Sequence, residues 1–117
     1  MQGYTVLFLL LVLVSCKTDY EDILLQGVVT DELSGSTIHK AKLGVTIWIY
    51  GNSPDESYSE EIFETLTTDS LGKFELKIEA AAFIQVHVSA PGYQDAFENI
   101  NIRGKKINLD FALNPDM

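Results

Sequence analysis

Short apolar or alternating runs, separated by turn-forming residues, follow one another along the chain from residue 23 onward. Apolar side chains at every second position indicate strands with one buried face, and no stretch predicts a helix of convincing length. The seven runs are Ile23–Thr30, Leu43–Tyr50, Ile62–Thr68, Lys73–Glu79, Phe83–Ala90, Gln94–Ile102 and Ile107–Leu113. Strands at this spacing predict an all-β fold, a seven-stranded Greek-key β-sandwich.

The run Lys73–Glu79 has the clearest alternation, because Phe74, Leu76 and Ile78 alternate with charged residues. Such a strand has one face in the core and one in water. The preceding Asp69-Ser70-Leu71-Gly72 has Asp at the first and Gly at the fourth position of a type I turn. This turn predicts a tight hairpin between the third and fourth strands.

The amino-terminal segment has a different pattern, because every residue from Val6 to Val14 is Val, Leu or Phe. This run is shorter than the roughly 20 residues of a transmembrane helix and suits the apolar region of a secretory signal peptide. Leu13-Val14-Ser15-Cys16 resembles a bacterial lipobox. The resemblance implies a signal peptide at residues 1–15 and acyl chains on Cys16 that hold the protein to a lipid bilayer. The alternative is a chance cysteine after an ordinary signal peptide or a short hydrophobic anchor.

A lipidated Cys16 with an acidic tether (residues 16–22) then precedes the predicted sandwich, residues 23–115. Lys17 stands where an Asp typically retains lipoproteins at an inner membrane, so we expect the outer membrane. A lysine with acidic residues just after the cysteine resembles an export signal of surface lipoproteins in some Gram-negative bacteria. The alternative is a solvated tether, which leaves open whether the domain faces the periplasm or the cell surface.

Charge and cysteine content narrow the function classes. The 117 residues include 8 Lys and Arg against 17 Asp and Glu, a net charge of −9. This balance excludes nucleic acid as a partner, because phosphate binding needs a basic surface. A single cysteine excludes an internal disulfide, and a chain of this size folds as one domain without one.

Four short motifs follow one another between Leu25 and Pro115. They are a strand that ends Gly-Val-Val-Thr-Asp (27–31) before a glycine turn, a Thr-x-x-x-Gly-x-Phe hairpin (68–74), a strand that ends in Gly-Tyr (92–93), and a last strand, Leu109–Leu113. In this order they resemble the carboxypeptidase regulatory-like domain. The resemblance implies a transthyretin-like sandwich that is usually without catalytic activity. Such domains occur beside zinc carboxypeptidases, at the front of outer-membrane receptors and as stand-alone lipoprotein modules.

Motifs for catalysis or metal binding are lacking. His39 and His87 stand in none of the spacings of zinc sites, and Ser36 lies in no nucleophile motif. The acidic stretch 55–64 lacks the spacing that folds carboxylates around calcium. We therefore predict no metal, no cofactor and no catalytic residue, and expect that the protein is not an enzyme.

The second predicted strand offers a candidate ligand face. If residues 45, 47 and 49 face the core, Thr46, Trp48 and Tyr50 face outward together. Exposed aromatic side chains serve contacts with sugars and proteins. The alternative is that the segment 52–61 or a neighbouring strand covers them.

These features together predict a lipoprotein, anchored to the outer membrane by acylated Cys16, whose sandwich binds a protein or a glycan at the cell envelope. The alternative is a structural spacer or an accessory subunit of an outer-membrane protein complex, which packs through an edge strand.

Overall fold

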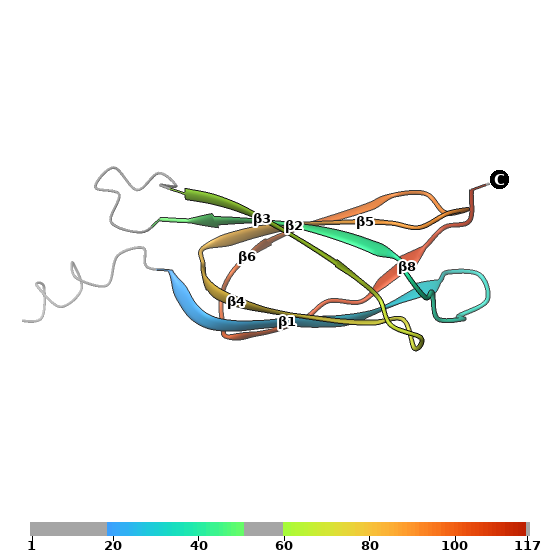
Figure 1. Cartoon of the computed structure of the whole chain (residues 1–117), viewed down its shortest axis with the longest axis horizontal. Coiled ribbons are helices and arrows are strands. Elements are labelled where there is room, and N and C mark those ends of the chain that lie inside the picture. The colour runs from blue at the N-terminus through green and yellow to red at the C-terminus, as the bar shows by residue number, and fades with distance from the viewer. Residues whose placement is uncertain (1–18, 51–59, 117) are drawn as a thin grey trace, which may run out of the picture.

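The computed structural model of the chain describes residues 19–50 and 60–116. The signal peptide and Cys16 of the sequence-based prediction lie outside these ranges. Within them no helix is long and apolar enough to cross a membrane. The described residues form eight strands (Figure 1): β1 (Tyr20–Asp31), β2 (Lys42–Ile49), β3 (Glu60–Thr67), β4 (Lys73–Ala81), β5 (Phe83–Ser89), β6 (Ala96–Asn101), β7 (Lys106–Asn108) and β8 (Phe111–Leu113).

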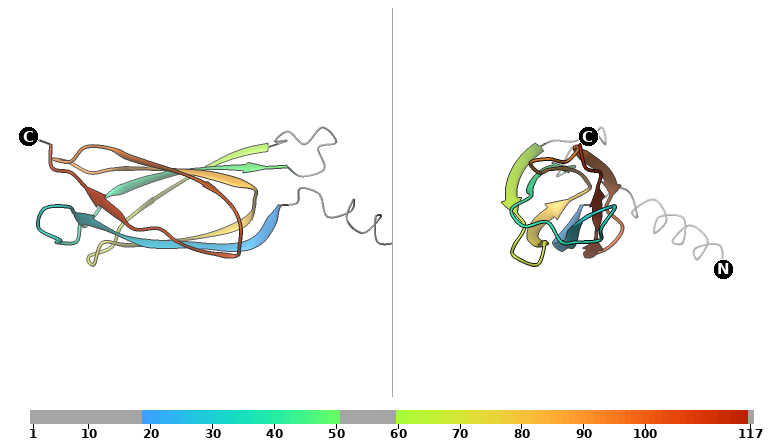
Figure 2. Two further views of the ribbon diagram at one scale, coloured as in Figure 1. Left: turned by 180° about the vertical axis from the view of Figure 1, so that it is seen from behind. Right: turned by 90° about the vertical axis from the view of Figure 1, so that its right-hand side faces the viewer.

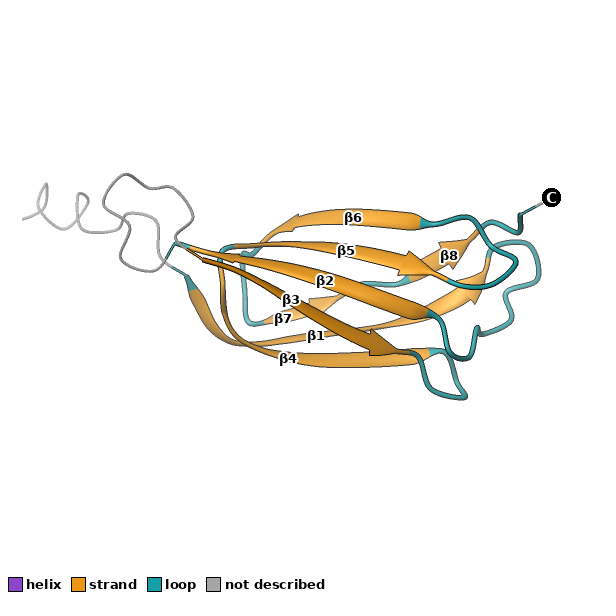
Figure 3. Ribbon diagram, turned by 45° about the horizontal axis from the view of Figure 1, so that its top comes forward, coloured by secondary structure: helices purple, strands orange, loops and turns teal. Residues whose placement is uncertain are grey.

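The strands form two sheets that face each other, as the end-on view in Figure 2 and the tilted view in Figure 3 show. One sheet has the order β4-β1-β7, with β8 also paired to β1, and the other has the order β3-β2-β5-β6. β1 pairs in parallel with β7 and β8, and the other pairs are antiparallel. The prediction of an all-β sandwich is confirmed, with eight strands where seven were predicted.

The core lies between the two sheets and is made by every second residue of the central strands. In β5, Ile84, Val86 and Val88 are fully buried, and they lie opposite buried residues of β2. β1 contributes Ile23, Leu25 and Val29 from the other sheet. Each such side chain stabilises the fold by about 1.5–3 kcal/mol relative to an exposed position.

β1 begins at Tyr20, before the apolar alternation that marks its predicted start at Ile23. Tyr20 and Glu21 lie opposite Ala81 and Ala80 of β4 in the antiparallel ladder. The pairing of main chains extends the strand here, although the exposed side chains show no apolar pattern. Sequence periodicity cannot detect this extension, because it reports side-chain burial alone.

The predicted last strand, Ile107–Leu113, is divided into β7 and β8 because the chain departs from the ladder where it passes Gly27. The backbone N–H of Val28 donates to Asp110 Oδ1 at 3.0 Å, so a side chain replaces the main-chain partner there. The carbonyl oxygen of Leu109 lies so close to Gly27 that a Cβ at that position would be 1.8 Å away. Only glycine fits this crossing.

The turn at Asp69–Gly72 forms, but the tight hairpin predicted between the third and fourth strands is wrong, because β3 pairs with β2 and β4 pairs with β1. The N–H of Gly72 donates to the carbonyl of Asp69 at 3.0 Å, and Gly72 has a φ of 72°. Asp69 Oδ1 accepts the backbone N–H groups of Lys73 and Leu71, each at 2.9 Å. These two hydrogen bonds lower the pKa of Asp69. The turn thus connects two sheets and not two paired strands, a difference set by long-range pairing that the turn residues do not determine.

Thr68 is a buried polar residue beside this turn, with 2% of its surface exposed. Its hydroxyl donates to the carbonyl of Ile38 at 2.6 Å and accepts the N–H of Ala41 at 2.9 Å. The threonine thus satisfies two buried backbone groups of the segment between β1 and β2.

Candidate functional site

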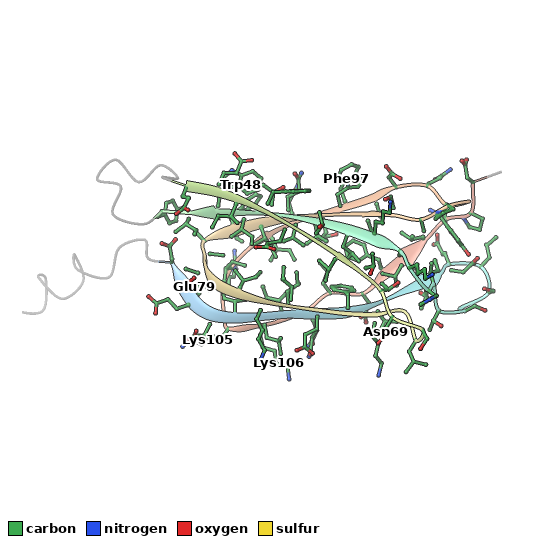
Figure 4. The ribbon with its side chains drawn as sticks, in the orientation of Figure 1. Trp48, Asp69, Glu79, Phe97, Lys105 and Lys106 are labelled. Carbon is green, nitrogen blue, oxygen red and sulfur yellow. The ribbon has the colours of Figure 1, made fainter. Side chains whose placement is uncertain are left out.

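The two outer faces of the sandwich differ in chemistry. The outward residues of β4, on the sheet β4-β1-β7, are all charged and exposed: Lys73, Glu75, Lys77 and Glu79. The outward residues of the other sheet include one aromatic side chain from each strand, and we call these four residues the aromatic face: Trp48, Phe63, Phe83 and Phe97. In Figure 4, Trp48 and Phe97 lie on one side of the sandwich, and Lys105 and Lys106 lie on the other.

β2 forms the centre of the aromatic face. Its core-facing residues alternate with Thr46 and Trp48, which are therefore on the outer side and half-buried. Thr46 lies opposite Phe63 of β3, and Trp48 lies opposite Phe83 of β5. The rings of Trp48 and Phe83 are tilted by 45° with centroids 5.2 Å apart. Strand pairing thus supplies the neighbours that partly cover Trp48.

Tyr50, the third residue of the predicted ligand face, follows the last residue of β2 and is half-buried. Its backbone N–H donates to Asp19 Oδ1 at 2.8 Å, which ties the end of β2 to the segment before β1. The structure therefore places Trp48 within the aromatic face, Thr46 beside it in the same outward row of β2, and Tyr50 just beyond the end of that strand.

The two most exposed rings of this face, those of Phe63 and Phe97, were not predicted as part of a ligand face. Phe63 is 64% exposed, and its ring lies over Gly44, where an added Cβ would be 3.0 Å from Phe63 Cζ. Phe97 is 60% exposed and stacks on His87 with centroids 4.4 Å apart and planes 5° from parallel. Each occupies an outward position of the alternating pattern in its own predicted strand, and this position is the signal by which its exposure could have been predicted.

His87 links the aromatic face to a carboxylate. Its Nε2 lies 3.0 Å from Asp95 Oδ2, with about half of each side chain exposed. This contact and the Phe97 stack hold both rings at fixed positions. His39 is exposed in the segment before β2. In the described ranges, no three or more His, Cys, Asp or Glu residues gather in a way that could hold a metal ion.

Polar uncharged side chains surround the aromatic rings. In the outward rows of the sheet they include Thr65 of β3, Gln85 of β5, and Asn99 and Asn101 of β6, while the carboxylate of Glu61 lies opposite Trp48. Amide and hydroxyl groups both donate and accept hydrogen bonds, and ring faces contact apolar CH groups. The combination suits a sugar ring or a mixed protein surface.

A separate polar contact joins the two sheets at the other end of the molecule. Tyr93 Oη donates to Asp31 Oδ2 at 2.8 Å, while Asp31 Oδ1 accepts the N–H groups of Ser34 and Leu33. The backbone bond from Ser34, followed by the Tyr93 bond, lowers the pKa of Asp31. The same carboxylate raises the pKa of Tyr93. This contact fixes the loop between β5 and β6 to the end of β1.

Comparison with protein-family models finds no match, and comparison with curated protein sequences finds none. The resemblance to the carboxypeptidase regulatory-like domain therefore stays a prediction.

The solved structures with a similar fold include three dioxygenases. Catechol 1,2-dioxygenase of Acinetobacter radioresistens has a TM-score of 0.61 and 17% identity, over 83% of this chain and 53% of that one. 3-Chlorocatechol 1,2-dioxygenase of Rhodococcus opacus has a TM-score of 0.63 and 12% identity, over 86% and 62% of the two chains. Hydroxyquinol 1,2-dioxygenase of Pseudomonas putida has a TM-score of 0.56 and 13% identity, over 87% and 58%. At these identities the likeness shows the fold alone.

These structures contradict the prediction that the protein is not an enzyme. That prediction rested on the lack of catalytic motifs and on a resemblance that implies a module usually without catalytic activity, yet these three solved structures with a similar fold are enzymes. The chain spans between about half and three-fifths of their lengths, from 53% to 62%. Their reactions are therefore not transferred to it, and the fold gives no ground for excluding catalysis.

Proposed function

We propose that this protein is a bacterial lipoprotein, held in the outer membrane by acylated Cys16, whose carboxypeptidase regulatory-like sandwich binds a protein or a glycan at the cell envelope through the aromatic face. The lipobox-like Leu13–Cys16 supports the anchor. Cys16 precedes the first residue of β1, Tyr20, by four positions, so the connecting chain reaches at most about 14 Å. The end of the sandwich at which β1 begins then lies close to the bilayer.

The exposure of Phe63 and Phe97 on one outer face is the observation that carries the binding proposal. Leaving a large apolar side chain in water instead of burying it costs about 1.5–3 kcal/mol. A single exposed apolar residue is ordinary, but here rings from all four strands of one sheet share a face, while the outward side of β4 is charged. A partner that covers these rings recovers this cost.

The anchor is tested by the fate of Cys16→Ala in intact cells, with Ser15→Ala as the matched control that keeps the thiol. We expect the control to fractionate with the outer membrane and Cys16→Ala to leave it. Membrane association that survives Cys16→Ala contradicts the anchor. Protease treatment of intact cells then decides the orientation: digestion indicates a cell-surface ligand, and protection indicates a periplasmic one.

The binding role is tested with the full-length protein in detergent, on an array of envelope polysaccharides and by co-purification with envelope proteins. We expect Phe63→Ala and Phe97→Ala each to weaken the interaction by at least about fivefold, because aromatic residues dominate such contacts. Leu33→Ala and Leu71→Ala are controls, since these side chains are 76% and 58% exposed away from the aromatic face. Equal effects from both pairs of variants would refute the assignment of the face.

The second candidate function, an accessory subunit that packs by strand addition, is favoured by the edge strand β6. β6 lies at the end of its sheet, and its sequence from Ala96 to Asn101 has no Lys or Pro to block pairing with another chain. Asn99→Pro removes a main-chain donor from this strand but leaves Phe97 in place. Co-purification that is lost in Asn99→Pro and kept in Phe97→Ala would favour this function over binding through the rings.

A further inference from the structure

A groove opens between the two sheets on the side opposite β6. It has a volume of about 670 Å³ and lies between β3 and β4. Figure 3 shows these two strands along one side of the sandwich, joined by the turn at Asp69–Gly72. Each is an edge strand, because among the described residues β3 pairs with β2 and β4 pairs with β1, with no strand on the other side.

The floor of the groove is apolar. Four isoleucines line it, and we call them the isoleucine floor: Ile47, Ile49, Ile62 and Ile78. Ile47 and Ile78 belong to the core, while Ile49 and Ile62 are only partly buried and pack against it. The groove thus gives an extended ligand access to the side of the core.

The rim of the groove is acidic. The lining residues include five carboxylates but only one ammonium group, that of Lys77. We call the five carboxylates the carboxylate rim: Glu21, Asp22, Glu60, Glu64 and Glu79. On β3 the two kinds of side chain alternate, because Glu60, Ile62 and Glu64 all line the groove at every second position. These three side chains point to the same side of the strand, so an extended occupant faces them with every second residue of its own. Basic, apolar and basic residues at those positions match both the floor and the rim.

We propose that this groove binds an extended segment of another protein in which Lys or Arg, an apolar residue, and again Lys or Arg stand at every second position. The apolar side chains of the segment contact the isoleucine floor, and its basic side chains pair with the carboxylate rim. Its main chain hydrogen-bonds to the free edge of β3 or β4, as in strand addition. The stretch of β3 from Glu60 to Glu64 is about 17 Å long, which corresponds to a segment of about five residues.

Charge argues that the segment comes from outside this chain. The stretch 51–59, which joins β2 to β3, contains Asp55 and Glu56 and no Lys or Arg. Before Tyr20 the chain has a single basic residue, Lys17. A second copy of a chain with a net charge of −9 is also repelled by the carboxylate rim. This site is separate from the aromatic face, so its failure would not affect the proposed function.

The test uses the full-length protein in detergent and the capped peptide Lys-Ser-Val-Ser-Lys as the probe. Two further peptides serve as controls: one of the same composition with the order Lys-Lys-Val-Ser-Ser, and one with Glu in place of Lys. We expect the probe to bind at least about tenfold more tightly than either control, because only its pattern satisfies floor and rim together. Equal binding of the two Lys peptides would show simple charge attraction and overturn the proposal.

Two double variants with the same net charge locate the site. Glu64→Gln with Glu79→Gln removes two carboxylates of the rim and is expected to weaken peptide binding at least about tenfold. Glu32→Gln with Glu98→Gln removes two exposed carboxylates outside the groove and is expected to change binding less than twofold. Equal losses in both variants, or chemical-shift changes confined to the aromatic face, would overturn the proposal.

Two measurements distinguish other occupants. If replacement of residues 51–59 by a Gly-Ser linker raises peptide affinity about tenfold or more, the chain's own segment fills the groove and the proposal fails. If the protein forms a dimer that Glu64→Gln with Glu79→Gln dissociates, a second copy is the occupant and the proposal fails as well. Unchanged affinity and a monomer at all concentrations support an external segment.

Discussion

His87 and Phe97 lie opposite each other on β5 and β6, and their rings stack with centroids 4.4 Å apart and planes 5° from parallel. The imidazole of His87 also contacts Asp95, with its Nε2 atom 3.0 Å from Asp95 Oδ2. The most exposed aromatic rings of the sheet are therefore supported from within it: Phe97 by His87, and Phe63 by the bare backbone of Gly44. A ring with this support loses little side-chain entropy when a partner covers it.

Replacement of Gly27 by Ala tests the crossing that divides the last strand. A Cβ at this position would lie 1.8 Å from the carbonyl oxygen of Leu109, so β7 and β8 must move away from β1. We expect a loss of at least about 2 kcal/mol in the free energy of unfolding, measured by urea denaturation. Gly104→Ala is the control, because nothing lies within 4 Å of a Cβ built there. Equal stability of the two variants would contradict the crossing.

Thr68→Val removes the buried hydroxyl and keeps the shape of the side chain. The carbonyl of Ile38 and the N–H of Ala41 then lose their partners inside the protein. We expect the free energy of unfolding to fall by about 1–3 kcal/mol, the cost of buried polar groups left unsatisfied. The exposed neighbour Thr67 provides the control, since Thr67→Val is expected to change stability by less than about 0.5 kcal/mol.

The contact of Tyr93 with Asp31 gives stability a defined dependence on pH. The pKa of Tyr93 is raised in the folded state, so its contribution is complete below its ordinary value of 10.0 and is lost as pH rises through the folded pKa. The pKa of Asp31 is lowered, so its contribution is complete above its ordinary value of 3.8 and is lost as pH falls through the folded pKa.

The contribution of Tyr93 is measured by comparing the free energy of unfolding of the wild type and of Tyr93→Phe from neutral to alkaline pH. The contribution of Asp31 is measured by the same comparison with Asp31→Asn from neutral to acid pH. We expect the stability difference between the wild type and Tyr93→Phe to be constant near neutral pH and to shrink above pH 10. For Asp31→Asn, we expect the difference to shrink below pH 3.8. A difference that does not change with pH in either variant would show that the contact does not contribute through ionisation.

The sequence predicts those features that depend on one strand at a time. Alternation along β2 placed Thr46 and Trp48 on the side away from the core, and Asp69 with Gly72 identified the turn before β4. Both follow from local rules, the period of two in a strand and the free φ of glycine.

The remaining features depend on which strands become neighbours. Phe63 and Phe97 share a face with Trp48 only because the sheet order is β3-β2-β5-β6, which brings together residues far apart in the sequence. The division between β7 and β8 depends on contact with Gly27 in β1, and the groove depends on β3 and β4 both being edges. Hydrophobic periodicity carries no information about which strands pair over long distances. The shared aromatic face, the divided last strand and the groove therefore could not be predicted from the sequence.

The most direct test of the proposed function is photo-crosslinking in intact cells, with p-benzoylphenylalanine placed at position 63 or 97. Leu33 and Leu71 are the control positions, because both side chains are exposed away from the aromatic face. We predict adducts with one envelope protein or glycan from positions 63 and 97, none from the controls, and loss of the adducts in Cys16→Ala. Adducts of equal yield from all four positions, or none from positions 63 and 97, would contradict binding through the aromatic face.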